Sequence, residues 1–146
     1  MQVKINQSTH NRPEGERILD APAVLVEIPQ YITQIKQEEA WHKSDRNAIT
    51  VFKTGSITLV INALHAGAEM ANIEVDGVFI IQVLEGEITI KAEEGEKRLS
   101  ANQMLVLHPC FRTHILAETD TVLMLTNVQS ESKEIRDGLV DNPKVL

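Results

Sequence analysis

The chain has 146 residues, of which 42 % are hydrophobic, and this length and composition are those of one globular domain. Its formal net charge is −7 with Lys and Arg scattered, which argues against a nucleic-acid partner because such a partner requires a basic surface. No apolar run reaches the roughly 20 residues of a membrane-spanning helix, so no membrane association is expected. A single cysteine cannot form an intrachain disulfide and is typical of a reducing compartment. The N-terminus is polar, unlike a secretory signal, and together these features predict a cytoplasmic protein.

The first 47 residues are predicted to form an N-terminal arm, an edge strand and a short helix. Residues 1–20 are polar and show no hydrophobic period, so they read as an arm. Residues 23–28 form a short apolar run between two prolines, which predicts a strand able to join the sheet edge of a partner subunit. Ile32 and Ile35 recur at helical spacing, which predicts a short helix over residues 30–42.

Residues 48–128 follow a β pattern. Apolar and polar residues alternate in short segments, separated by turns rich in Gly, Asn and Asp. Many short strands at regular spacing predict a sandwich or barrel. Residues 129–146 form a polar C-terminal tail, with one or two helical turns expected around residues 133–136.

One segment shows the spacing of a known metal-binding motif. From Gly67, five residues lead to Ile73, one more to Val75, three to Phe79 and six to Gly86. This spacing resembles the first motif of the cupins, in which the last four landmarks are two histidines, a glutamate and a glycine. The framework is therefore retained, while the three ligand positions carry Ile, Val and Phe.

Two further segments carry the same resemblance. Residues 83–90, VLEGEITI, are similar to a hairpin common in small cupins. Downstream, Asn102 stands at the first glycine of the second cupin motif, Pro109 and Cys110 at its proline–glycine corner, and His114 about one residue after the motif histidine. The chain thus resembles a small single-domain cupin of the RmlC-like superfamily. This implies an all-β double-stranded β-helix (a jelly-roll barrel) over residues 48–128.

The metal-ligand positions indicate a barrel without the usual metal. Ile, Val and Phe side chains have no lone pairs for a divalent cation, so we expect no metal, no cofactor and no catalytic residue at these positions. His65 shares its strand face with apolar residues and is predicted to point into the barrel, as is His114 by its place in the motif. The expected ligand pocket is either open to a small molecule or filled by side chains. Its residues are His65, Ile73, Val75, Phe79 and His114.

Two functions remain open at this point. The first is a metal-free barrel that binds or senses a small molecule. The alternative is a metal-dependent isomerase, dioxygenase or decarboxylase, in which His65 and His114 hold a displaced metal with Glu69, Glu74 or His108. Cys110 is interpreted as either a reactive thiol or a small apolar corner residue.

The outer face of the barrel predicts a self-association surface. Val60, Leu64, Ile80 and Leu84 fall on the faces opposite the expected interior rows. So many apolar residues are unfavourable in solvent, and small cupins generally bury such a face between two copies. We therefore expect a symmetric homodimer.

Overall fold

The computed structural model describes residues 2–93, 95–109 and 112–129, and these residues form an all-β molecule with two short helices. The helices are α1 (Ile28–Gln37) and α2 (Glu39–Lys43). The strands are β1 (Lys4–Asn6), β2 (Arg17–Asp20), β3 (Arg46–Lys53), β4 (Ile57–Leu64), β5 (Glu69–Ile73), β6 (Gly77–Glu85), β7 (Glu87–Ala92), β8 (Gly95–Ser100), β9 (Met104–Leu107), β10 (Thr113–Ala117) and β11 (Thr121–Gln129). The expected all-β class is confirmed. Cys110 and the tail after residue 129 lie outside the described residues.

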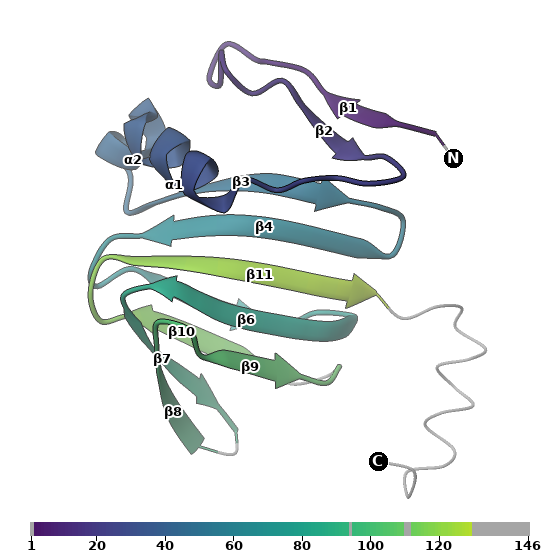
Figure 1. The fold of residues 1–146 in the computed structure, drawn as a ribbon. Helices are drawn as coiled ribbons and strands as arrows, with labels where there is room; N and C mark the ends of the chain where they lie inside the picture. Colours follow the sequence, from purple (N-terminus) through teal and green to yellow (C-terminus); the bar gives the residue numbers. More distant parts are fainter. Residues whose placement is uncertain (1, 94, 110–111, 130–146) are drawn as a thin grey trace, which may run out of the picture.

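Two antiparallel sheets form the barrel (Figure 1). The larger has the order β3-β4-β11-β6-β9 and the smaller has the order β5-β10-β7-β8. Strands that are distant in sequence pair within each sheet, as β4 does with β11 and β5 with β10. This is the jelly-roll arrangement that the resemblance to the cupins implies.

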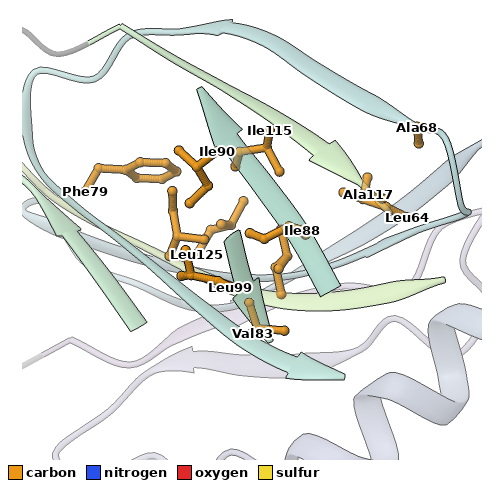
Figure 2. Packing of buried hydrophobic residues seen from close by; sticks show 12 residues of the cluster. Leu64, Ala68, Phe79, Val83, Ile88, Ile90, Leu99, Ile115, Ala117 and Leu125 are labelled. Carbon is orange, nitrogen blue, oxygen red and sulfur yellow. The ribbon is translucent and has the colours of Figure 1, made fainter. Parts of the chain in front are cut away.

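The space between the sheets is filled by apolar side chains from both of them. On β6 the buried residues alternate, so that Phe79, Ile81 and Val83 face inward. They meet residues of the smaller sheet such as Ile90 and Ile115, and Figure 2 shows the Phe79 ring pointing toward Ile90. This inner cluster has 12 buried residues, which makes the described interior a packed core.

The helices cover the other face of the larger sheet. Ile35 of α1 and Trp41 of α2 pack with Ile61 and Ala63 of β4 in a second, outer cluster. The row of β4 expected to face the interior therefore faces the helices, and Leu64, expected on the outside, is in the inner cluster. That prediction was wrong because both faces of β4 are apolar, so the alternation alone does not tell which face is interior.

Ile80 and Leu84 do lie on the outer side of β6, as the alternation of burial shows. Leu84 packs against the outer cluster under the helices. Val60 lies four residues before Leu64 on β4, so both side chains are on the same, inner face of the sheet. Half of the expected outer apolar set is thus inside the barrel.

The N-terminal region differs from its prediction in two places. Residues 23–28 form no strand, and the chain instead enters α1 through Pro29, a residue suited to the first turn of a helix. The arm, expected to lack structure, forms the hairpin β1–β2. The expected helix is present but is broken at Glu38, whose backbone is extended.

Two arginines attach this arm to the edge of the larger sheet. The Arg12 guanidinium donates to the Ala48 carbonyl at 2.7 Å, and Arg17 donates to the Thr50 carbonyl at 2.6 Å. Both carbonyls belong to β3, one of the two edge strands of the sheet. The arginines therefore satisfy edge acceptors that would otherwise be open to another strand. Among the described residues, no helix is long and apolar enough to cross a membrane.

Candidate ligand site

The three apolar motif residues lie at one end of the inner cluster. Phe79 is 6 % exposed and belongs to the cluster, while Ile73 and Val75 pack against it half-buried. Their neighbours in the cluster are hydrocarbon side chains. The positions at which a cupin would hold a metal are therefore built into an apolar core, and their side chains do not fit a cation.

Thr113, rather than His114, occupies the inward position on β10. Thr113, Ile115 and Ala117 are buried while the residues between them are not, so His114 points to the opposite side of the strand. Thr113 also pairs in register with Ile73. The sequence carried this signal, because counting the second motif from Asn102 without an insertion ends on residue 113. The prediction that His114 points into the barrel was wrong.

Two polar atoms at this end of the barrel lack a partner. Thr113 is 2 % exposed, and its hydroxyl has no hydrogen-bond partner among the described residues. The same is true of the side-chain oxygen of Asn127, which is paired in register with Phe79. A buried polar atom without a partner costs free energy, and such sites usually hold water or a ligand atom.

His65 lies against α2 and away from this end. Its ring stacks on Trp41 with centroids 3.4 Å apart, and its Nε2 lies 2.8 Å from the Trp41 carbonyl oxygen. Because a carbonyl only accepts, Nε2 is the protonated nitrogen. Its Nδ1 is 3.8 Å from an Asp120 carboxylate oxygen. Trp41 belongs to the outer cluster, so the prediction of an inward His65 was also wrong.

His114 borders a depression of about 170 Å³ at the end of the smaller sheet. The depression lies where β5 and β7 end and β10 begins. A register shift between β5 and β10 and a left-handed backbone at Asn72 (φ 53°) mark a bulge beside it. Its lining comprises Asn72, Lys91, Ala92, Glu93, Arg112, Thr113 and His114.

The basic side chains of this depression each have one distant carboxylate. The Arg112 guanidinium is 3.5 Å from Glu74, and His114 Nε2 is 3.6 Å from Glu69. Lys91 Nζ is 3.6 Å from a Glu96 oxygen. These distances exceed the roughly 2.7–2.9 Å of a charge-assisted hydrogen bond, and such exposed pairs contribute little to stability.

A second depression, of about 200 Å³, lies between the arm and α1. It combines three carboxylates with one arginine and an aromatic ring. Its lining comprises Glu14, Glu16, Arg17, Leu25, Glu27, Gln30, Tyr31 and Gln34.

A displaced metal site does not fit the described residues. No three His, Cys, Asp or Glu side chains among residues 2–93, 95–109 and 112–129 lie together as metal ligands would. Glu69 and His114 approach each other, but His65 is engaged by Trp41. A metal held by protein side chains alone usually needs at least three of them.

The two facing sheets and the apolar motif positions define a barrel of the cupin type, and comparison with solved structures shows the same fold. A cupin superfamily protein from Desulfitobacterium hafniense matches with a TM-score of 0.62 and 11 % identity, over 87 % of this chain and 99 % of that one. A conserved protein of unknown function from Streptococcus pyogenes matches with a TM-score of 0.59 and 17 % identity, over 77 % and 92 %. An RmlC-like cupin from Shewanella frigidimarina matches with a TM-score of 0.55 and 17 % identity, over 62 % and 81 %.

No family model and no curated protein sequence matches the chain. At these identities the likeness shows the cupin fold. Cupin barrels carry many unrelated functions, so the function has to be argued from the site.

Proposed function

We propose that this protein is a metal-free cupin that binds a small molecule, and that the ligand occupies the depression beside Thr113 and His114. The observation that carries the proposal is the apolar packing of Ile73, Val75 and Phe79 where metal ligands would stand. A barrel with this interior holds no metal for catalysis at the motif position. Binding without catalysis is the function that its remaining features support.

The depression supports the proposal by its position and its polar groups. It lies at the same end of the barrel as the motif residues, since Thr113 both lines it and pairs with Ile73. An arginine, a lysine, a histidine and an asparagine line the depression. A concave site with a few convergent polar groups is the common form of a small-molecule site.

Elemental analysis tests the metal-free part of the proposal. The protein is purified without an affinity tag, and its content of Ni, Zn, Fe and Mn is measured. We expect less than stoichiometric amounts of each. A stoichiometric metal would overturn the proposal and favour the metal-dependent enzyme.

Ligand binding is tested by recording amide NMR spectra of the native chain against a panel of neutral, acidic and basic small molecules. We expect at least one compound to shift the amides of Asn72, Lys91 and Thr113 in a saturable way. A panel that leaves these amides unchanged would contradict the site.

The metal-dependent enzyme remains the second candidate because of the Glu69–His114 pair, in which a carboxylate and an imidazole lie 3.6 Å apart. It would need at least one further ligand. His114→Gln should abolish metal uptake in this case, whereas His65→Gln should not, since His65 is bound to Trp41.

We also propose that the protein forms a homodimer and is located in the cytoplasm. Met104 and Val106 of β9 are 54 % and 51 % exposed, on the side of the sheet that carries Ile80. A second copy would remove this apolar surface from water. The single cysteine fits a reducing compartment.

A further inference from the structure

We propose that the ligand of the depression at the end of the smaller sheet is a small molecule with an oxyanion, either a carboxylate or a phosphate, bound by Lys91, Arg112 and His114. This inference rests on the proposed function and adds the chemical class of the ligand. It also assigns the oxyanion to the outer rim of the barrel, outside the position where a cupin motif would hold a metal.

The charges of the lining carry the first step. Lys91, Arg112 and His114 present three basic groups to the depression, and Glu93 is the one carboxylate among the lining residues. The carboxylates that approach the basic groups, on Glu69, Glu74 and Glu96, come from outside the lining. Basic residues therefore outnumber acidic ones in the lining itself, although the whole chain carries a net charge of −7.

The hydrogen bonds carry the second step. Within the described residues, the side chains of Lys91, Arg112 and His114 make no hydrogen bond, and each has a carboxylate oxygen at 3.5–3.6 Å. A guanidinium has five N–H donors in a planar fork that matches a carboxylate or phosphate. An oxyanion in the depression would approach to about 2.7–2.9 Å and form the charge-assisted bonds that the protein leaves unmade.

The neutral groups and the volume limit the rest of the ligand. Asn72 belongs to the same lining, and Ala92 adds a small apolar surface. A volume of about 170 Å³ is below the roughly 300–1,000 Å³ of drug-sized sites. The depression itself accommodates a small acid or a compact phosphate group.

Calorimetric titration of the native full-length chain tests the proposal. Inorganic phosphate, malonate and a neutral diol are titrated separately at constant ionic strength set with sodium chloride. We expect saturable binding of phosphate or malonate, and the preferred anion distinguishes the two sources of the oxyanion. The diol should not bind.

Two variants assign the binding to this depression. Arg112→Gln should lower the affinity for the preferred anion by about tenfold or more, because it removes a hydrogen bond to a charged group. Arg98→Gln is the matched control, because Arg98 is an exposed arginine of the same sheet that pairs with Glu87 at 2.6 Å. It should leave the affinity unchanged, and Lys91→Gln should weaken binding if Arg112→Gln fails to fold.

The outcomes separate this inference from the proposed function. If neither anion binds but a neutral compound shifts the amides of the depression, the ligand class is wrong and the binding function stands. If no compound of any class binds, both fail. Equal losses in Arg112→Gln and Arg98→Gln would overturn the inference, since they would show a general effect of charge.

Discussion

Phe79 stands at the glutamate position of the cupin motif, and its side chain is 6 % exposed within the inner cluster. Its burial supports the core at the end where Ile73 and Val75 also pack. Truncating a buried phenylalanine removes its transfer free energy and leaves a cavity, at a typical cost of about 3–5 kcal/mol. The residue that excludes a metal is thus also one that stabilises the barrel.

Restoring the motif ligands should restore a metal site only if Thr113 is also replaced by histidine. The variant Ile73→His, Val75→His, Phe79→Glu and Thr113→His should melt at a lower temperature than the native chain, since it buries polar groups in an apolar core. Adding Zn should recover part of this loss through binding linkage. Thermal melts with and without Zn measure both effects.

The matched control is the triple variant that keeps Thr113. Its recovery with Zn should be smaller, because His114 lies on the other side of β10. Equal recovery in the two variants would show that His114 reaches the interior after all. A melt unchanged by the substitutions would show that these side chains face solvent.

His65 should hold α2 on the sheet. His65→Ala removes a stacked ring and the hydrogen bond to the Trp41 carbonyl, each worth about 1 kcal/mol. We expect the free energy of unfolding to fall by about 2 kcal/mol. Trp41 is the single tryptophan, so its fluorescence during urea unfolding reports the change directly.

His65→Phe separates the two contributions. It keeps an aromatic ring for the stack and removes the hydrogen bond, so its loss should be about half that of His65→Ala. An unchanged stability in His65→Ala would contradict the role of His65 as a structural contact of α2.

At the scale of elements, the arm and α1 meet at Glu38. The Glu38 carboxylate accepts from the Arg12 guanidinium at 2.9 Å and from the Asn47 amide at 3.0 Å. Burial acts to raise the pKa of Glu38, but the hydrogen bonds from Arg12 and Asn47 outweigh it, and the pKa lies below its ordinary value. This carboxylate joins the arm, the break between the helices and the edge of β3.

The lowered pKa predicts a loss of stability in acid. The pKa of a glutamate in an unfolded chain is about 4.3. Above that pH the folded state gains the full contribution of Glu38, and the contribution disappears as the pH falls through the lower folded pKa. Glu38→Gln should therefore be less stable than the native chain at pH 7, and its stability should fall less between pH 5 and pH 3.

Urea unfolding at pH 7, 5 and 3 measures this dependence. Glu39→Gln is the neighbouring control, since Glu39 pairs with Lys43 on the exposed surface of α2. Solvent and salt screen such a pair, so its effect should be small at each pH. Identical acid profiles for Glu38→Gln and the native chain would contradict the prediction.

At the scale of the whole molecule, the larger sheet is covered unevenly. The helices cover its outer side at β3 and β4 (Figure 1). On β9, by contrast, Met104 and Val106 are exposed. These two residues lie in register with Gln82 and Ile80 of β6. The uncovered part extends over two neighbouring strands. In the proposed symmetric dimer, this same surface of each copy would face the other.

Val106→Lys should disrupt the proposed dimer. A charge in an apolar contact costs desolvation free energy that the contact does not return. Size-exclusion chromatography with light scattering should give about twice the chain mass of 16.3 kDa for the native protein and 16.3 kDa for the variant. Leu25→Lys, at an exposed leucine near α1, should remain dimeric. A native mass of 16.3 kDa would exclude the dimer.

The sequence by itself determined the β character of residues 48–128 and the cupin framework. The β pattern of residues 48–128 is confirmed by the strands from β3 to β11. Alternation has a period of two residues whatever the strand packs against, and the turn residues between strands act locally. These features therefore appear in the chain without knowledge of its tertiary contacts. The loss of the motif ligands was equally visible, because it depends only on residue type and spacing.

Only the tertiary structure decided which face of each strand is inside. Ile61 and Leu64 are both fully buried on opposite faces of β4, one under the helices and one between the sheets. The His65 side chain lies on the side of the helices because it stacks on Trp41. Thr113 lies beside Ile73 because of the register between β5 and β10, which includes a bulge. Such choices depend on contacts between segments distant in sequence. The local hydrophobic pattern is the same for either face, so it does not indicate which face lies inside the barrel.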